Sequence, residues 1–353
     1  MSPHADVPRP WAERLVAWHA IHGRHDLPWQ RTREAYRIWL SEVMLQQTQV
    51  ATVIPYFERF VARFPDVRAL ADAPIDAVLE CWAGLGYYRR AHHLHAAAQA
   101  VMRDHRGVFP LDAATLEALP GIGRSTAAAI AAFAEGERNA ILDGNVKRVL
   151  ARHAGIDGYP GEPRVAAALW DVAESRMPGQ DVEAYTQAMM DLGATVCIRT
   201  RPRCAECPVA EDCVARRDGR IADLPSPRPR KPLPQRSTVV LLIERGGTLL
   251  FERRPATGIW GGLWSFPEVA GDADIVDAMH ARYGVAARVT AELAPVRHAF
   301  THFALTLHPR RIAVATWPPR AESPGRVWLT RDDARHAALP SPIRKIVAAL
   351  PDT

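Results

Sequence analysis

The sequence predicts a mainly α fold in which an all-α region is followed by a smaller α+β domain. From residue 11 to about residue 221, alanine-rich apolar positions recur at helical spacing, and proline and glycine separate the runs. Beyond residue 237 the apolar residues form short β-rich runs. Residues 223–236 hold five prolines, which favour an extended, solvated linker. We therefore expect a helical domain over residues 1–222 and a second domain over residues 237–353.

Each region contains elements that can be placed in advance. In the first region, apolar periodicity predicts helices over residues 67–83, 91–102, 126–134, 165–173 and 185–192. In the second, Gly246-Gly247 between two β-rich runs predicts a hairpin. Two more strands are expected within residues 300–317, and helices over residues 273–283 and 343–350.

Composition places the chain among soluble globular proteins. Apolar residues make up 48% and charged residues 24% of its 353 residues, and no run approaches the roughly 20 apolar residues of a membrane span. The first residues lack a basic start followed by an apolar core, so we expect a cytoplasmic protein with no membrane partner. The net charge of +5 is compatible with a polyanionic partner, and only three of the 44 basic residues are lysine.

Four of the five cysteines lie in one short segment, "CIRTRPRCAECPVAEDC", with the spacing C-x6-C-x2-C-x5-C. Disulfides are uncommon in the cytoplasm, so these thiolates are expected to bind a metal centre. One compact run favours a single [4Fe–4S] cluster, and zinc, which usually binds two separated cysteine pairs, is the alternative. The expected ligands are Cys197, Cys204, Cys207 and Cys213. The isolated Cys81 is expected to be a small buried residue.

The segment "LEALPGIGRSTAAAIAAFA" places two glycines between two helical runs, within about residues 115–135. Gly121 and Gly123 can adopt positive φ and expose backbone N–H groups beside the N-terminus of the second helix. A helix–hairpin–helix of this kind binds a DNA phosphate without reading base sequence. The alternative is an ordinary helix pair that turns on glycine.

Two carboxylates are candidates for chemistry. Glu42 interrupts the apolar run "IWLSEVML", and on a continuous helix Gln46 and Gln49 would lie near its face. The ordinary interpretation is the solvated stripe of an amphipathic helix. Asp143 precedes "GNVKRVLAR", where the common role of an aspartate is to cap a helix, although a cap would also hold a catalytic carboxylate rigidly.

The hairpin, the aspartate about twenty residues later and the cysteine spacing together resemble the endonuclease III superfamily of helix–hairpin–helix DNA glycosylases. The segments "LPWQ", "SEVMLQQTQV", "WAGLGYYRRA", "ILDGNVKRVLAR" and "QAMMDLGATVC" are similar to those of the MutY-type adenine DNA glycosylases in particular. The resemblance spans residues 11–221 and continues more weakly beyond them. It implies a monomeric base excision repair enzyme that flips adenine out of double-stranded DNA, where adenine is mispaired with 8-oxoguanine or guanine, and leaves an abasic site.

The resemblance also implies roles for individual residues. Glu42 matches the catalytic glutamate, suited to protonate N7 of adenine where burial keeps its carboxyl neutral. Asp143 matches the carboxylate that stabilises or traps the oxocarbenium-like sugar. Ser125 stands where bifunctional relatives carry a Schiff-base lysine, and Lys147 is the only lysine of the helical region, so a monofunctional enzyme is expected.

Further residues are assigned by the resemblance alone. Those expected to line the adenine pocket are Trp29, Leu45, Val50, Ser125, Asn145 and Gln187. Those expected to contact DNA are Gln47 as the wedge, Tyr87 as the intercalating aromatic, and the hairpin residues Gly121 and Gly123.

The C-terminal domain resembles a Nudix (MutT-type) fold. Gly262 and Glu268 fit the opening of its metal-binding motif, but the following stretch, "VDAMHA", lacks clustered glutamates, so no hydrolase activity is expected. Phe300, Thr301 and His302 match the loop with which relatives recognise 8-oxoguanine, with threonine where serine is usual.

Two other classes of function fit parts of this pattern. One is a different glycosylase of the superfamily, acting on mismatched thymine or an oxidised pyrimidine. The other is a non-catalytic DNA damage sensor. Glu42, Ser125 and the C-terminal domain argue against the first, and the presence of both Glu42 and Asp143 argues against the second.

Overall fold

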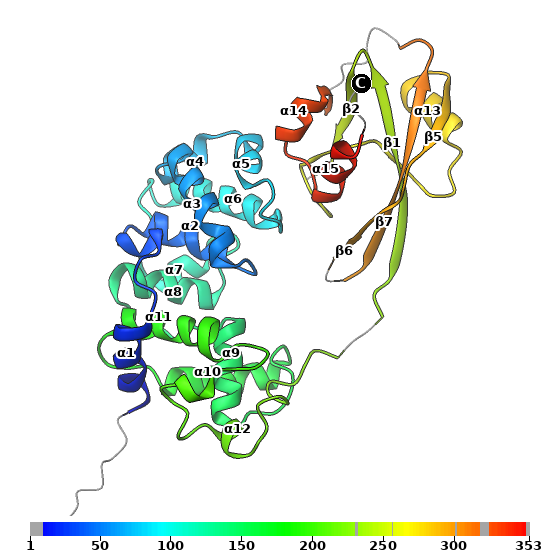
Figure 1. Ribbon diagram of the computed structural model, residues 1–353. Helices are drawn as coiled ribbons and strands as arrows, with labels where there is room; N and C mark the ends of the chain where they lie inside the picture. The colour runs from blue at the N-terminus through cyan, green and yellow to red at the C-terminus, as the bar shows by residue number, and fades with distance from the viewer. Residues whose placement is uncertain (1–9, 230–231, 256, 301, 318–324, 351–353) are drawn as a thin grey trace, which may run out of the picture. The chain divides into compact units, whose positions relative to one another are not determined.

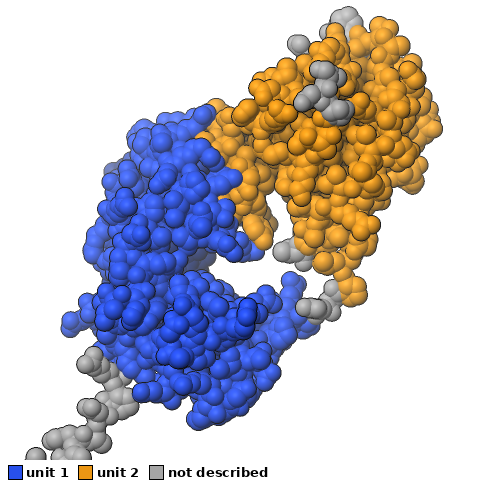
Figure 2. Space-filling view, in the orientation of Figure 1, with its two compact units in different colours: residues 1–72, 93–230 blue, residues 73–92, 231–353 orange. Residues whose placement is uncertain are grey.

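The computed structural model describes residues 10–229, 232–255, 257–300, 302–317 and 325–350. The chain divides into two compact units, one formed by residues 1–72 and 93–230 and the other by residues 73–92 and 231–353 (Figure 2). The segment 73–92 belongs with the C-terminal residues because it contacts them. Arg253 forms an ion pair with Asp76, and Nε2 of His92 lies 3.0 Å from the carbonyl oxygen of Gly261. In the part of the chain described, no helix is long and apolar enough to cross a lipid bilayer.

The first unit is built from helices, as the apolar periodicity predicts. Its helices are α1 (Trp11–His22), η1 (Pro28–Arg31), α2 (Ala35–Leu45), α3 (Val50–Arg63), α4 (Val67–Asp72), most of α6 (Arg89–Asp104), α7 (Ala113–Glu117), α8 (Arg124–Glu135), α9 (Gly144–Ala154), α10 (Pro163–Ser175), α11 (Val182–Asp191), η2 (Leu192–Val196), η3 (Cys204–Glu206) and α12 (Val214–Arg217). The single helix predicted over residues 67–83 is wrong, because α4 ends at Asp72 and α5 (Ile75–Trp82) begins after Pro74. Proline lacks a backbone N–H and disfavours helical backbone at the residue before it.

Alanine-rich faces let these helices pack closely. α8 buries Ala127, Ala128, Ala131 and Ala132, and it packs against α2 (Figure 1). α1 packs against α11 in the same way. Closely packed helices cannot shift independently of one another. Residues at the ends of α2, α8 and α11 are therefore held rigidly.

The helix–hairpin–helix consists of α7, a turn and α8. Asp112 caps α7 by accepting a hydrogen bond from the backbone N–H of Thr115. Gly121 has φ +78°, and a Cβ there would lie 2.6 Å from Cβ of His93. Gly123 has φ −100° and is the N-cap of α8, so the expected positive φ is correct for Gly121 and wrong for Gly123. A Cβ on Gly123 would meet nothing within 4 Å, so the N-terminus of α8 is open to a ligand.

The second unit is an α+β domain around a mixed sheet, as predicted. Besides α5, its elements are β1 (Gln235–Arg245), β2 (Thr248–Arg253), β3 (Trp264–Ser265), β4 (Glu268–Val269), α13 (Ile275–Tyr283), β5 (Ala287–Glu292), β6 (Val296–Ala299), β7 (Ala304–Val314), β8 (Arg326–Thr330), α14 (Arg331–His336) and α15 (Ser341–Ala348). β1 and β7 run in parallel from the pair Gln235↔Ala304 to Ile243↔Ile312 (Figure 1). The other strand pairs within the described residues are antiparallel.

The hairpin and strand predictions for this unit have different outcomes. Gly246 and Gly247 have φ +53° and +76° and join β1 to β2, which confirms the hairpin. The two strands expected within residues 300–317 are wrong, because β7 is one continuous strand. Arg310 and Arg311, in the middle of β7, do not form a turn that would divide it. Arg310 pairs with Glu292 on the neighbouring strand β5 at 3.1 Å.

Gly121→Ala is expected to destabilise the protein by about 1–3 kcal/mol, because alanine is strained at positive φ and its Cβ would displace His93. Gly123→Ala is the matched control two residues away. Its backbone suits alanine and the space around it is open, so the free energy of unfolding should change by less than about 0.5 kcal/mol. Urea unfolding measures both variants, and equal losses would contradict the role given to the left-handed backbone at Gly121.

Candidate active site

Glu42 lies in the most apolar helix of the first unit. α2 buries nearly all of its other side chains, namely Ala35, Tyr36, Ile38, Trp39, Leu40, Ser41, Val43 and Met44. The helix ends at Leu45, with Gln46 as its C-cap, and Gln49 is the N-cap of α3. The expectation that Glu42 and Gln49 share a face of one helix is therefore wrong, since the helix stops between them.

Glu42 lines a cavity of about 690 Å³ within the first unit. Trp29 and Gln187, two of the residues assigned to the adenine pocket, line the same cavity. Burial, and after it the negative charge of Asp143, raises the pKa of Glu42 to about 8. The carboxyl group therefore holds its proton at neutral pH, as a general acid must, and it does not belong to a solvated stripe.

Asp143 has the N-cap geometry that its sequence position favours. Its Oδ1 accepts hydrogen bonds from the backbone N–H groups of Asn145 at 2.9 Å and Val146 at 2.7 Å, so α9 begins directly behind it. Burial raises the pKa of the Asp143 carboxyl, and these two N–H groups lower it. Burial has the larger effect, so the pKa of Asp143 lies above its ordinary value, while the N–H groups at the positive end of α9 favour the charged form. The cap and the catalytic role are compatible, since the cap fixes where the charge lies.

Ser125 binds the segment that leads into Asp143. Its Oγ accepts a hydrogen bond from the backbone N–H of Leu142 at 2.9 Å, one residue before Asp143. The first turn of α8 thus holds the segment that leads into α9, and the hydroxyl has a structural partner rather than a free orientation.

Only two of the residues assigned to the adenine pocket line the cavity that contains Glu42. Trp29 lies in η1, where its ring packs edge-on against Phe57 with centroids 5.4 Å apart, and Trp29 and Gln187 line the cavity with Glu42. The others are not among the residues lining that cavity and lie at helix ends: Leu45 in α2, Val50 in α3, Ser125 in α8 and Asn145 in α9.

A buried polar network beneath the cavity was not foreseen from the sequence. The carboxylate of Asp191, 1% exposed, accepts hydrogen bonds from Arg24 and from the side chain of Gln187. His19 and His25 also line the cavity, and their rings are 4.6 Å apart. The signal that could have revealed the network is the pair Gln187 and Asp191, polar residues four apart that flank the apolar run Ala188–Met190 of α11.

Gln47 and Tyr87, the residues assigned to contact DNA, share an unusual backbone. Gln47 has φ +58° and is exposed, and Tyr87 has φ +48° with 48% of its surface exposed. Left-handed backbone at residues other than glycine costs free energy and gathers at functional sites. This strain is an observation independent of any resemblance.

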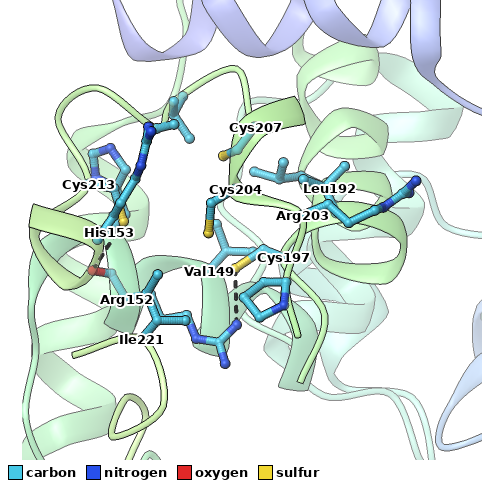
Figure 3. A pocket seen from close by; sticks show the side chains of 15 residues that line it. Val149, Arg152, His153, Leu192, Cys197, Arg203, Cys204, Cys207, Cys213 and Ile221 are labelled. Atoms are coloured by element: carbon cyan, nitrogen blue, oxygen red, sulfur yellow. Dashed lines mark hydrogen bonds between the residues drawn. The ribbon is translucent and has the colours of Figure 1, made fainter. Parts of the chain in front are cut away.

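The four clustered cysteines line one hollow of the first unit, and Figure 3 shows their sulfur atoms directed into it. Apolar residues from α9, η2 and the following loop complete the lining, among them Val149, Leu192 and Ile221. Burial raises the pKa of the Cys207 thiol to about 11, so a bound cation would be needed to hold it as a thiolate. Cys81 is buried in the second unit, as expected for an isolated cysteine.

Two arginines of α9 fasten this helix to the cysteine loop. Arg148 donates to the carbonyl oxygen of Cys197 at 2.8 Å and to Oδ1 of Asn145 at 3.0 Å. Arg152, nearly fully buried, donates to the carbonyl oxygen of Ile198 at 2.8 Å, and its Nη1 lies 3.5 Å from Sγ of Cys197 (Figure 3). Asp143 caps the N-terminus of α9, and the later turns of α9 are therefore bound to the loop that carries the cysteines.

In the second unit, Phe300 and His302 flank the turn between β6 and β7, and Thr301 lies outside the described residues. Phe300 belongs to an aromatic group, with ring centroids 5.3 Å from Trp260 and 4.6 Å from His298. Glu268 of the Nudix-like motif accepts from Arg254 and from Ser265. Its carboxylate is therefore engaged by protein groups, and α13, which follows it, carries a single carboxylate, Asp277.

A helix–hairpin–helix together with two candidate catalytic carboxyl groups is typical of DNA base excision enzymes, and comparison with known proteins agrees. Residues 40–175 match the model of the HhH-GPD superfamily of base excision DNA repair proteins, and residues 238–349 match that of the NUDIX domain. The structure is similar to that of a thermostable thymine-DNA glycosylase, with a TM-score of 0.54 and 27% identity, over 59% of this chain and 95% of that chain.

Relatives of full length define the family more closely. The chain is 33% identical to the adenine DNA glycosylase of Buchnera aphidicola (subsp. Acyrthosiphon pisum), covering 96% of both chains. It is 33% identical to the adenine DNA glycosylase of Homo sapiens, covering 94% of this chain and 72% of that protein. The chain therefore belongs to the adenine DNA glycosylase family and is an adenine-specific DNA N-glycosylase.

The two roles of Asp143 can be separated by a matched pair of variants. Asp143→Asn keeps an oxygen that accepts from the N–H groups of α9, so the free energy of unfolding should change by less than about 0.5 kcal/mol. Asp143→Ala removes the cap and should cost about 0.5–2 kcal/mol. Thermal or urea unfolding measures both. A large loss in Asp143→Asn would mean that the charge, rather than the cap geometry, stabilises the helix.

Proposed function

We propose that the enzyme removes adenine mispaired with 8-oxoguanine or guanine in double-stranded DNA by hydrolysis, as a monofunctional glycosylase acting as a monomer. The observation that carries the proposal is the presence of Glu42, whose pKa burial raises to about 8, together with Asp143, whose carboxylate is held in place as the N-cap of α9. Glycosidic hydrolysis uses one carboxyl group as the acid and a second one at the sugar.

Glu42 is the general acid in this mechanism. Adenine is a poor leaving group as an anion, and a proton delivered to a ring nitrogen, N7, makes its departure easier. A carboxyl group with a pKa of about 8 carries that proton at neutral pH. Once adenine has left, the same group is ionised and can accept a proton from the incoming water.

Asp143 acts on the sugar. As the glycosidic bond breaks, positive charge develops on the sugar, and a carboxylate beneath it stabilises that charge or bonds to the anomeric carbon until water replaces it. The cap bonds to Asn145 and Val146 hold the carboxylate in one orientation before the substrate arrives, so little reorganisation accompanies the reaction.

A monofunctional reaction follows from the absence of a placed amine. Ser125 stands where a Schiff-base lysine is found in bifunctional relatives, and its hydroxyl accepts from the backbone of Leu142. Lys147 is the only lysine of residues 1–222, and it lies within α9. Water, rather than an amine, is therefore the final nucleophile.

DNA would be bound by the hairpin and by Gln47 and Tyr87, two of the six described non-glycine residues with positive φ. The open N-terminus of α8 beside Gly121 and Gly123 presents backbone N–H groups to a phosphate. Gln47 and Tyr87 would fill the space left by the flipped adenine and intercalate beside it, which offsets part of the cost of unstacking.

The cysteine hollow fits a [4Fe–4S] cluster held by Cys197, Cys204, Cys207 and Cys213. Four sulfurs face one hollow, yet no three of the described His, Cys, Asp and Glu side chains are close enough to hold a single metal ion. A cluster of four irons spreads its thiolate ligands more widely than one zinc ion does, which favours the cluster. When bound, it would cross-link the loop that Arg148 and Arg152 fasten to α9.

The C-terminal domain would read the base opposite adenine. Phe300 and His302 lie in the turn between β6 and β7, beside Trp260, and Thr301 between them supplies a hydroxyl group. A hydroxyl can bond to the N7–H or the carbonyl group that distinguishes 8-oxoguanine from guanine. The domain would then act in recognition rather than in hydrolysis of a nucleotide.

The protonation state of Glu42 predicts how activity depends on pH. The acid form of Glu42 is present below its raised pKa, so the single-turnover rate constant for adenine release should fall as pH rises through about 8. Glu42→Gln and Asp143→Asn should each reduce the rate by about 100-fold or more. Glu183→Gln is the matched control, because that carboxylate also lines the cavity but is half-exposed and paired with Arg33. A full rate in Glu42→Gln would refute the mechanism.

The cluster proposal predicts a brown protein with thiolate-to-iron absorption in the visible range and about four irons per chain. Cys204→Ser should lose most of that absorption, whereas Cys81→Ala, at the fifth cysteine, should retain it. A colourless protein with one zinc ion per chain would establish the alternative.

Recognition of the lesion can be tested at one hydroxyl group. Thr301→Val has the same shape without the hydroxyl, and it should lower the preference for 8-oxoguanine over guanine opposite adenine by about five- to ten-fold. Thr301→Ser keeps the hydroxyl and should keep the preference. The measured quantity is the ratio of single-turnover rates on the two duplexes, and an unchanged ratio in Thr301→Val would exclude this contact.

A further inference from the structure

Asp191 is the most deeply buried carboxylate beside the cavity, and it lies at the end of α11. It accepts three hydrogen bonds from Arg24: from the backbone N–H at 2.7 Å, from Nε at 2.8 Å and from Nη2 at 2.5 Å. A fourth comes from Nε2 of Gln187 at 2.8 Å. All four partners are N–H groups, so the side-chain oxygens of Asp191 act as acceptors in every one of these bonds.

This contact fixes the orientation of the Gln187 amide. A glutamine side chain has one end that donates and one that accepts, and only the NH₂ end can face an ionised carboxylate. The carbonyl oxygen Oε1 is therefore held on the side away from Asp191. Gln187 lies one helical turn before Asp191 and lines the cavity together with Glu42.

We propose that Asp191 is a positioning residue for substrate choice. By holding the NH₂ end of Gln187, it leaves the carbonyl oxygen to accept a hydrogen bond from an amino group on the purine. The cavity then favours a purine with an exocyclic amino group over one with hydrogen or a carbonyl group at the same position. The inference rests on the proposed function of Glu42 in this cavity and extends it to specificity.

Without Asp191 as a negative charge, the amide has no reason to keep one orientation. An asparagine in its place can present either an oxygen or an NH₂ group to Gln187, so the amide can rotate and offer a donor to the base. An amino group on the purine then faces a donor and loses its partner. A purely structural role of Asp191, in joining α11 to Arg24, would slow the reaction on every purine alike.

The test compares two substrates in the same duplex, each opposite guanine: adenine, and purine without the 6-amino group. The measured quantity is the ratio of their single-turnover rate constants for base release. Asp191→Asn is expected to lower the adenine-to-purine ratio by at least about five-fold, the value of roughly one neutral hydrogen bond. The ratio is insensitive to the fraction of active enzyme, because both substrates are measured on one preparation.

A double-mutant cycle shows whether Asp191 acts through Gln187. In a Gln187→Leu background the amide is absent, so Asp191→Asn should change the ratio by less than about two-fold. Met189→Ala is the matched control, since Met189 is also buried on α11 and is not among the residues that line the cavity. It should lower stability and leave the ratio unchanged.

The proposal is overturned if Asp191→Asn slows both substrates equally, or if it changes the ratio as much in the Gln187→Leu background as in the otherwise unaltered enzyme. Should Asp191→Asn not fold, Arg24→Met removes two of the donors that hold the Asp191 carboxylate in place, and a ratio unchanged in that variant also overturns the proposal. Failure of the proposed function is distinct from either result, because it would appear as full adenine release by Glu42→Gln in the same assay.

Discussion

Removal of one carboxyl group from water is the constraint on which the catalytic arrangement depends. Glu42 is carried by a helix whose neighbouring side chains are buried, and this burial raises its pKa to about 8. The same residue on a solvated face would be ionised at neutral pH and could not protonate a base. The close packing of α2 against the alanine-rich α8 is therefore part of the chemistry, because it holds the helix that carries the acid.

The second carboxylate is placed by a helix end. Asp143 lies at the N-terminus of α9, with two backbone N–H groups directed at it. The two groups therefore differ in position, since Glu42 lies within a helix and Asp143 caps one. Arg148 and Arg152 bind α9 to the cysteine loop, so the location of the charge depends on a segment more than fifty residues away in sequence.

Local patterns explain which structural predictions were right. Helix and strand types follow from apolar spacing, and the hairpin at Gly246-Gly247 follows from backbone freedom, all of which act over a few residues. The errors arose where neighbours in space decide. β7 continues through its charged middle because Arg310 pairs with Glu292 on another strand. Gly123 has ordinary backbone because its place is set by the cap of α8, whereas Gly121 must turn beside His93.

The sequence by itself determined the family, the two-part architecture, the two carboxylates and the four cysteines, because each rests on residue type and short spacing. Only the tertiary structure decided that Glu42 is protonated, since its pKa depends on what covers it. It also placed Trp29 and Gln187 around the cavity of Glu42 and not Leu45 or Val50. The bond that orients Gln187 lies on one helix, but the Asp191 carboxylate is held in place by Arg24, 167 residues away. Contacts over such separations leave no local pattern to read.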